Sequence, residues 1–179
     1  MSRMRNFTQR DTMKWHVLYT RYHHERAVYE RLLAKGFEPY LPIARVGRQA
    51  HYGLRRVASP LFPRWLFVRC YLEMYAHIEL FSISGVLQIV EDPHGQPLVV
   101  AEGEIQLLRR LCNIGTALES SEYPPDGEIV EVVEGKLRGI SGFFSTKNKT
   151  TLLIPLHTLR TSVAVEVGPT QVVSYSHRN

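Results

Sequence analysis

The chain has 179 residues, of which 44% are hydrophobic and 22% charged, as is usual for one medium or two small globular domains. It has no run of about 18 apolar residues and no apolar segment in its basic N-terminus, so we expect neither a transmembrane helix nor a secretory signal. Two distant cysteines, Cys70 and Cys112, predict reduced core thiols in a cytoplasmic protein.

The net charge of +5 belongs to the first part of the chain. Residues 1–112 hold 16 Lys and Arg against 10 Asp and Glu, a net charge of +6, while residues 113–179 hold 6 against 7, a net charge of −1. Fourteen of the first 16 cations are arginine, whose planar fork binds phosphate bidentately. This predicts an anionic partner, with nucleic acid as the default; an ordinary basic surface is the alternative.

The elements expected up to residue 112 alternate between strands and helices. Residues 1–13 read as a loose basic arm, and residues 14–112 as a domain. Its expected elements are a strand at Lys14–Thr20, a helix at Tyr22–Lys35 stopped by Gly36, an extended segment at Phe37–Ile43, a basic hairpin at Arg45–Arg56, a strand at Trp65–Tyr71, a helix at Glu73–Ser82, a strand at Val86–Val90, a turn at Asp92–Gly95 and a helix at Ala101–Cys112. This alternation predicts a small mixed sheet with packed helices.

The remaining residues predict a linker followed by short strands. Residues 113–125 lack periodicity and end in two prolines, which indicates an inter-domain linker. Residues 126–179 read as a second domain, opened by a segment that alternates with period two and contains closely spaced glycines. Further strands are expected at Thr151–Pro155, Ser162–Val167 and Gln171–Tyr175, in a five-stranded barrel.

These segments resemble a known family at three ordered places. The glycines of the second domain resemble a KOW motif: Gly127, Gly135, Gly139 and Gly142. The stretch Trp15–Tyr19, with Glu25–Ala27 and Gly36–Pro42, resembles the opening of a NusG-type N-terminal domain, and Pro60–Val68 resembles that family's signature "P-L-F-P-x-Y-[LV]-F-V". The resemblance implies an α+β protein: a NusG-type N-terminal domain followed by a five-stranded Tudor-like KOW β-barrel.

The resemblance also implies a function. NusG-type proteins are non-enzymatic elongation factors that dock an apolar surface on the clamp helices of RNA polymerase, bridge to the opposing lobe and suppress pausing. Thr20–His24 is similar to the polar stretch of the specialised RfaH-like (UpxY- and LoaP-like) branch, which antiterminates particular operons and reads the non-template DNA strand. At the lobe contact, Ala76–Glu79 replaces that branch's His-Thr-Thr-Thr. The β-branched second domain predicts a stable barrel with no fold switch.

Candidate site residues follow from the polymerase-binding and DNA-reading roles that the resemblance implies. The polymerase-binding candidates are Trp15, Tyr19, Phe62, Pro63, Trp65 and Phe67, with Tyr19 and Phe62 preferred. Because an alternating strand exposes one face, the alternative is that about half of this set is core. The nucleic-acid-binding candidates are Arg21, Tyr22, His23, His24, Arg45, Arg48, Arg55 and Arg56. The alternative is a solvated surface.

The second domain adds a third candidate surface. Leu137, Ile140 and Leu159 are predicted as exposed docking positions for a ribosomal or termination-factor partner; the alternative is that they fill the barrel core. We expect the protein to be a monomer with no metal, cofactor or membrane partner. Two other functions stay open: a ribosome- or RNA-associated KOW protein that never touches polymerase, and a nuclease using residues such as His24 and Glu25.

Overall fold

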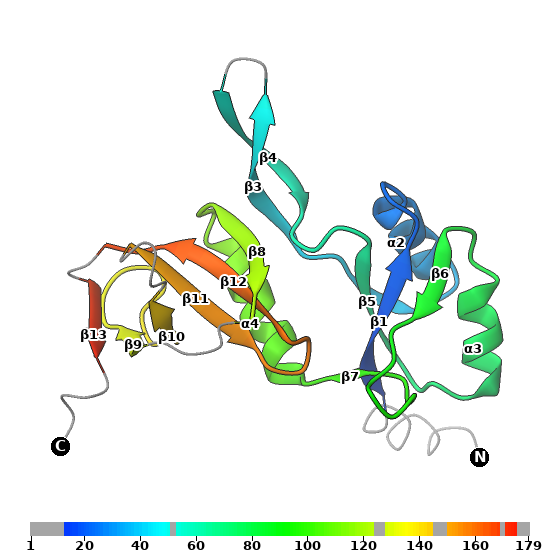
Figure 1. Ribbon diagram of the computed structural model, residues 1–179. Helices are drawn as coiled ribbons and strands as arrows, with labels where there is room; N and C mark the ends of the chain where they lie inside the picture. The colour runs from blue at the N-terminus through cyan, green and yellow to red at the C-terminus, as the bar shows by residue number, and fades with distance from the viewer. Residues whose placement is uncertain (1–12, 51–52, 124–127, 145–149, 169–170, 175–179) are drawn as a thin grey trace, which may run out of the picture. The chain divides into compact units, whose positions relative to one another are not determined.

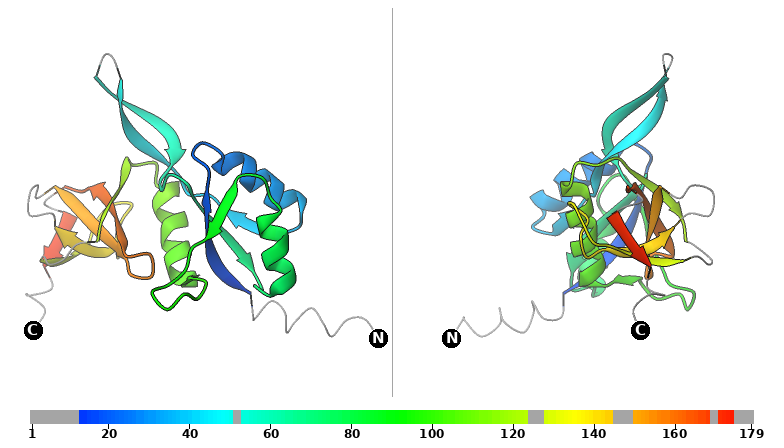
Figure 2. Two further views of the ribbon diagram at one scale, coloured as in Figure 1. Left: turned by 45° about the vertical axis from the view of Figure 1, so that its right-hand side comes forward. Right: turned by 90° about the vertical axis from the view of Figure 1, so that its left-hand side faces the viewer.

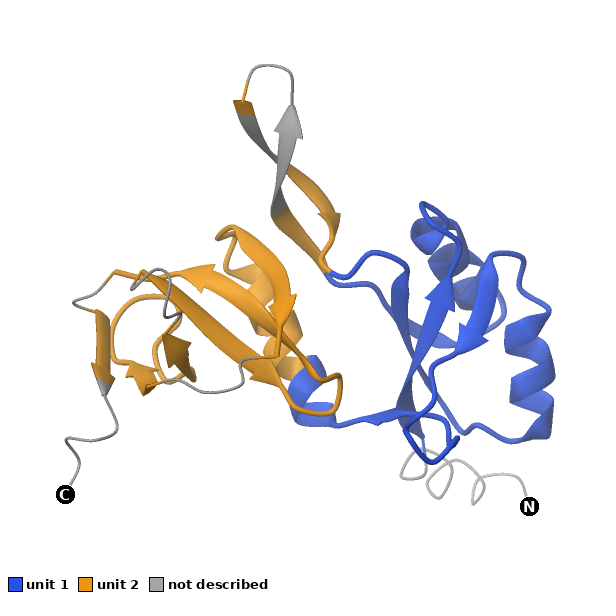
Figure 3. Cartoon of the chain, viewed as in Figure 1, with its two compact units in different colours: residues 1–42, 62–105 blue, residues 43–61, 106–179 orange. Residues whose placement is uncertain are grey.

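The computed structural model describes residues 13–50, 53–123, 128–144, 150–168 and 171–174 (Figure 1). The chain divides into two compact units, residues 1–42 with 62–105 and residues 43–61 with 106–179 (Figure 3). The predicted arm, residues 1–13, lies outside the described residues except for Met13. Within the described part of the chain, no helix is both long and apolar enough to span a membrane.

The first unit is built on an antiparallel sheet with β1 (Lys14–Thr20) near its centre. On one side β1 pairs with β5 (Trp65–Cys70), which pairs in turn with β2 (Glu38–Tyr40). On the other side β1 pairs with β6 (Val86–Ile89) and β7 (Val99–Val100). The prediction of a mixed sheet, with both parallel and antiparallel pairs, is therefore wrong for the described strands. Because β5 lies between β1 and β2, every strand there has antiparallel neighbours.

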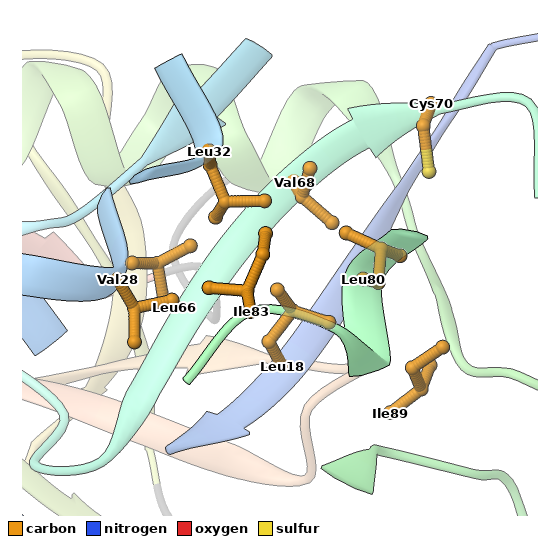
Figure 4. Packing of buried hydrophobic residues seen from close by; sticks show 9 residues of the cluster. All are labelled: Leu18, Val28, Leu32, Leu66, Val68, Cys70, Leu80, Ile83 and Ile89. Carbon is orange, nitrogen blue, oxygen red and sulfur yellow. The ribbon is translucent and has the colours of Figure 1, made fainter. Parts of the chain in front are cut away.

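Two helices cover one face of this sheet, α2 (Glu25–Ala34) and α3 (Met74–Phe81), as Figure 2 shows. Leu18, Leu66 and Val68 from the strands meet Val28 and Leu32 from α2. The cluster is completed by Cys70, Leu80, Ile83 and Ile89 (Figure 4). Fully buried side chains such as Leu18 and Leu32 each contribute about 1.5–3 kcal/mol by leaving water. This core holds β1 and β5 in register.

Helix α2 begins three residues later than predicted and ends one residue earlier, at Ala34. The φ angle of His23 is 63°, a left-handed conformation that a right-handed helix cannot include, so Tyr22 lies outside the helix. At the other end Gly36 has a φ of 81°, and the Phe37 N–H donates to the Leu32 carbonyl at 3.0 Å. This is the glycine stop expected of a helix C-terminus.

The predicted basic hairpin is formed by β3 (Ile43–Ala50) and β4 (Gly53–Pro60). Its register sets Arg48 opposite Arg55 in the backbone ladder. Residues 51–52 lie outside the described residues. Helix α4 (Glu102–Asn113) matches the helix predicted at Ala101–Cys112 within one residue at each end.

The second unit contains a six-stranded antiparallel sheet. Its strands, in spatial order, are β13 (Val172–Ser174), β9 (Ile129–Val132), β10 (Ser141–Phe144), β11 (Thr151–Leu156), β12 (Thr161–Glu166) and β8 (Leu118–Glu122). Strand β8 falls within the predicted linker, where it pairs with β12. Among the described residues the sheet is an open path from β13 to β8, so the predicted closed barrel is not found.

Candidate functional site

The face of the first sheet opposite to α2 and α3 is aromatic. Antiparallel pairing sets Tyr19 directly across from Trp65, Val17 across from Phe67 and Trp15 across from Arg69. Directly opposed residues project from the same face of a sheet. Tyr40 on β2 joins them, with its ring centroid 6.1 Å from that of Phe67 and 6.5 Å from that of Trp15. One face of β1, β5 and β2 therefore carries a layer of rings.

Half of the predicted polymerase-binding residues are buried. Trp15, Phe62 and Phe67 are 2%, 5% and 0% exposed, so the prediction that they present surface is wrong. The Trp15 indole donates to the Glu102 carboxylate at 2.7 Å, as a core tryptophan must when its N–H leaves water. Phe62 packs on Trp65, with ring centroids 5.8 Å apart. These three residues support the layer of rings from within.

The other half of that set stays accessible. Pro63 is exposed, and Tyr19 and Trp65 are half-buried. Because Tyr19 and Trp65 oppose each other on one face, and Pro63 precedes Trp65 by two residues, the three belong to one region at the end of β1. The sequence preference for Tyr19 fits this placement, and the preference for Phe62 does not.

Arg64, which lies between Pro63 and Trp65, connects this region to the end of β1 and the start of α2 through hydrogen bonds. Its backbone N–H donates to the Glu25 carboxylate at 2.8 Å, and its carbonyl accepts the Thr20 N–H at 2.8 Å. Its side-chain Nε donates to the Thr20 carbonyl at 3.1 Å, and its guanidinium lies 4.2 Å from the centroid of the Tyr19 ring. Glu25, only 5% exposed, thus has a structural partner. Sequence reasoning did not select Arg64.

Immediately after β1, four of the predicted nucleic-acid residues lie together in one turn. Arg21 and Tyr22 are exposed, Tyr22 at 55%, and the ring of His23 lies 3.9 Å from the ring of Tyr22. The turn is tied down because the Arg21 N–H donates to the Gly85 carbonyl and the His24 N–H to the Arg21 carbonyl. The partly buried His24 is the first residue before α2. A cation and two adjacent rings, tilted by 52° to each other, therefore face solvent on a fixed backbone.

The hairpin arginines are placed only in part. Arg45 is exposed on β3. For Arg48, Arg55 and Arg56 the structure describes the backbone alone, with Arg48 opposite Arg55 and Gly47 opposite Arg56. The backbone register therefore gathers these three arginines within two rungs of the ladder.

The family profile described as "Transcription termination factor nusG" matches residues 13–109, more than half of the chain. The chain belongs to the NusG family. Thermotoga maritima NusG, solved in a study of its domain interaction, is similar at 20% identity and a TM-score of 0.57, over 91% of this chain and 97% of that one. That likeness supports the fold. It agrees with the mixed α and antiparallel β architecture seen here.

Two structures of the MjSpt4:Spt5 complex are also similar. Conformation B matches at 15% identity and a TM-score of 0.34, over 90% of this chain and 96% of that one. Conformation A matches at 14% identity and a TM-score of 0.33, over 89% and 96%. At these TM-scores the likeness carries no structural argument. No curated protein matches the sequence significantly.

Two of the KOW-like glycines of this NusG-family chain lie in the β9–β10 connection, and Gly142 lies in β10. Gly135 and Gly139 have φ angles of 78° and 80°, which favour glycine. A Cβ atom on Gly142 would lie 2.6 Å from the Leu153 carbonyl oxygen, so the neighbouring strand excludes a side chain there. Gly127 lies outside the described residues.

The three residues predicted to dock a partner in the second unit are interior. Leu137, Ile140 and Leu159 are 7%, 4% and 6% exposed, so the prediction of exposure is wrong and the core alternative describes their packing. The turn after β9 folds back on itself: the Ile140 N–H donates to the Leu137 carbonyl, and Gly139 and Ile140 bond to Val132. This carries Leu137 and Ile140 inward.

Helix α3 carries an apolar stripe that sequence reasoning missed. Met74, Tyr75, Ile78 and Phe81 are 81%, 71%, 63% and 47% exposed, and Tyr71 just before the helix is 48% exposed. Ala76 and Leu80 face the core instead. Within the helix, the spacing of 74, 75, 78 and 81 is the period of one helix face. The helix is apolar on both faces, which is the signal that could have revealed it.

Two buried ionisable groups of the first unit have shifted pKa values. Burial lowers the pKa of His16, although its Nδ1 hydrogen bond to the Leu98 carbonyl, at 3.2 Å, opposes that shift. Burial raises the pKa of the Cys70 thiol to about 11. No group of three His, Cys, Asp or Glu side chains suited to a metal occurs within the described ranges. Glu25, named in the nuclease alternative, instead holds the Arg64 backbone.

Proposed function

We propose that this NusG-family chain is a transcription elongation and antitermination factor that binds bacterial RNA polymerase at the clamp helices and the opposing lobe. It suppresses pausing and termination without catalysing a reaction. The observation that carries the proposal is the family match over residues 13–109 together with two accessible apolar regions on the unit that this match covers.

The clamp-helix contact is assigned to the accessible members of the predicted set, Tyr19, Pro63 and Trp65. Tyr19 and Trp65 oppose each other across β1 and β5, and Phe62 packs behind Trp65. A ring supported from below by a buried ring keeps its orientation, so less side-chain entropy is lost on binding. Aromatic anchors of this kind are often worth about 2 kcal/mol or more at an interface.

The lobe contact is assigned to the apolar stripe of α3. The RfaH-like branch carries His-Thr-Thr-Thr in the corresponding stretch, which is Ala76–Glu79 here. Tyr75 and Ile78 are 71% and 63% exposed, so apolar burial replaces polar contacts in this proposal. At about 25 cal/mol per Å² of apolar surface, covering such a stripe favours association.

An operon-specific role is assigned through the turn at Arg21–His24. Arg21 supplies a cation, and the adjacent exposed rings of Tyr22 and His23 offer a surface for an unpaired base of the non-template strand. In this proposal, the arginines of the hairpin, which follows α2 and β2 in the sequence, bind phosphates. The predicted members of this second set are Arg45, Arg48, Arg55 and Arg56.

The second unit is assigned the recruitment of a further factor, such as the ribosome or a termination factor. Since Leu137, Ile140 and Leu159 are buried, the docking surface is instead placed at Ile129 and Val173, which are 47% and 43% exposed. Val173 pairs with Glu131, two residues from Ile129, so both project from one face of the β9–β13 ladder. The strands here are rich in β-branched residues, which supports a stable β structure.

In vitro transcription with bacterial RNA polymerase tests the proposal. Templates carry a pause site and a terminator, and the readout is transcript length with and without the protein. The test variant is the double substitution Tyr75→Ala and Ile78→Ala on the exposed face of α3. Loss of both side chains is expected to weaken polymerase binding at least about tenfold, which is about 1.4 kcal/mol. The variant should fold normally because both residues face solvent.

The matched control is Leu33→Ala, an apolar residue 46% exposed on α2. The proposal predicts longer transcripts with the unmodified chain and with Leu33→Ala, and shorter ones with the α3 double variant. Equal activity of the α3 variant and the control would remove the lobe contact. Failure of the unmodified chain to bind polymerase in a pull-down would remove the polymerase function altogether.

A further inference from the structure

Arg64 occupies a backbone conformation that few side chains adopt. Its φ angle is 71°, and among the described residues only His23 and Arg160 are other non-glycine positions with positive φ. Such a conformation is strained for a residue with a Cβ atom, and it persists where surrounding contacts impose it. It lies in the segment Pro60–Val68, at the position that the family signature leaves free.

The contacts of Arg64 hold its side chain in one place. The Nε atom donates to the Thr20 carbonyl at 3.1 Å, and the guanidinium lies over the Tyr19 ring at 4.2 Å. The Thr20 N–H and hydroxyl both donate to the Arg64 carbonyl, at 2.8 and 3.2 Å. The arginine is thus anchored to the last two residues of β1 before its terminal nitrogens are used.

Those terminal nitrogens are free for a ligand. Within the described part of the chain, the two Nη atoms of Arg64 have no hydrogen-bond partner, and neither is fully buried. The face of the guanidinium turned away from Tyr19 is a planar cation on which a base can stack, and the Nη atoms can donate to a phosphate or a base edge.

We propose that Arg64, stacked on Tyr19, is a specificity-determining residue of a binding site for single-stranded nucleic acid that continues through Arg21, Tyr22 and His23. The proposal rests on the non-template contact proposed above and adds the residue that connects it to β1. Tyr19 and Tyr22 are three residues apart, so their Cα atoms are at most about 11 Å apart, a span of two or three nucleotides. The cations of Arg21 and Arg64, the Arg64–Tyr19 contact and the exposed ring pair of Tyr22 and His23 favour an unpaired strand over an acidic peptide.

The orientation of the site is fixed before any ligand arrives. Thr20 is fully buried and binds Arg64 through its backbone and its side chain, and the buried Glu25 accepts the Arg64 N–H at 2.8 Å. A preorganised cation loses little entropy on binding, so its removal should affect affinity more than the loss of one mobile surface charge.

Titration of the full chain into a fluorescein-labelled single-stranded DNA of about 12 nucleotides, over a range of salt concentrations, tests this assignment. The test variant is Arg64→Gly. The matched control is Arg160→Gly, which replaces another arginine at positive φ, 49°, exposed where Arg64 is half-buried, and removes the same charge from the second unit. Because glycine adopts positive φ without strain, neither variant is expected to lower the midpoint of thermal unfolding through its backbone.

We expect Arg64→Gly to weaken binding at least about tenfold and to reduce the slope of log affinity against log salt by about 0.7, the value for one phosphate contact on a single strand. Arg160→Gly should bind as the unmodified chain does. Arg64→Lys, which keeps the charge but not the planar stack, should recover the salt slope without the full affinity.

Equal binding by Arg64→Gly and Arg160→Gly would overturn the assignment, as would full recovery by Arg64→Lys, which would reduce the role to simple charge. Preference for a duplex of the same sequence, or for an acidic peptide competitor, would also overturn it. An unmodified chain that lengthens transcripts yet binds no single strand overturns this inference together with the non-template contact, and leaves the proposed polymerase contacts standing. A chain that binds the strand through Arg64 but leaves transcription unchanged overturns the proposed function alone.

Discussion

Gly142 on β10 is the position where adding a single methyl group should do most damage to the second unit. A Cβ atom there would lie 2.6 Å from the Leu153 carbonyl oxygen and 3.0 and 3.1 Å from Cδ1 and Cγ of Leu152. The nearest atom is backbone on the paired strand β11, where Phe143 opposes Leu153. The strain therefore cannot be relieved by turning a side chain, and Gly142→Ala must separate the two strands.

Overpacking of a well-packed interior typically costs about 1–3 kcal/mol, and the involvement of a ladder carbonyl places this case near about 3 kcal/mol. For a unit of this size, that loss lowers the midpoint of thermal unfolding by more than about 10 °C. Both tryptophans, Trp15 and Trp65, belong to the first unit, so tryptophan fluorescence reports on that unit alone. Far-UV circular dichroism reports on both. The variant should shift the dichroism transition and leave the fluorescence transition in place.

Gly103→Ala in the first turn of α4 is the matched substitution with the opposite expectation. A Cβ there meets no atom within 4 Å and the backbone is helical, so the change should stabilise by about 0.5–1 kcal/mol. An unchanged dichroism midpoint for Gly142→Ala, or equal shifts of the same sign for both variants, would refute the steric reasoning.

Two further predictions rest on buried groups. Burial lowers the pKa of His16 in the folded chain, with a small further lowering from the charge of His77, so the buried imidazole stays neutral. Below a pH of about 6.5 the unfolded chain therefore binds more protons than the folded chain. The free energy of unfolding should fall there, as the pH is lowered, by up to about 1.4 kcal/mol per pH unit. Urea unfolding at pH 7.5 and 5.5 measures this, and a His16→Leu variant that keeps the same pH dependence would contradict it. With a pKa of about 11, the Cys70 thiol is roughly 0.3% ionised at pH 8.5. Iodoacetamide should therefore label Cys70 more than about 100 times more slowly in the folded chain than in the chain unfolded by urea. Equal labelling rates, measured by mass spectrometry, would count against the burial of Cys70.

The strands and helices that sequence patterns predicted are those with a strong apolar period. Strand β1 occurs at Lys14–Thr20 as predicted. Its four successive residues from Trp15 to Leu18 are buried, as the sequence pattern of a buried strand indicated. Strand β8 was missed because only Leu118 of its five residues is buried. Its pairing with β12 depends on backbone hydrogen bonds and on the Thr161 and Ser162 hydroxyls, which donate to Ser121 and Glu122 carbonyls. A polar edge strand leaves no hydrophobic period in the sequence.

The site residues were predicted less well than the elements for a related reason. An aromatic residue in a signature segment is equally consistent with an interior anchor and an exposed one, and periodicity alone decides only which residues share a face. Trp65 and Phe67 share a face, yet Phe67 is fully buried while Trp65 is half exposed. The difference comes from coverage: Phe67 lies within the layer formed with Tyr40, and Trp65 stands at its end.

The residues that identify this chain as a NusG-family member and those that would set its specificity occupy different positions in the same short segment. Leu61, Phe62, Leu66, Phe67 and Val68 are all buried, so the recognisable part of the signature is what builds the sheet. Arg64, at the unspecified position, contributes a guanidinium that lies on the Tyr19 ring and is bonded to the Thr20 carbonyl through Nε. Since a buried core tolerates little change, family resemblance carries the fold reliably and leaves the ligand to partly exposed positions such as Arg64. Substitution at Arg64 should accordingly change nucleic-acid binding while the fold, and with it the family membership, stays intact.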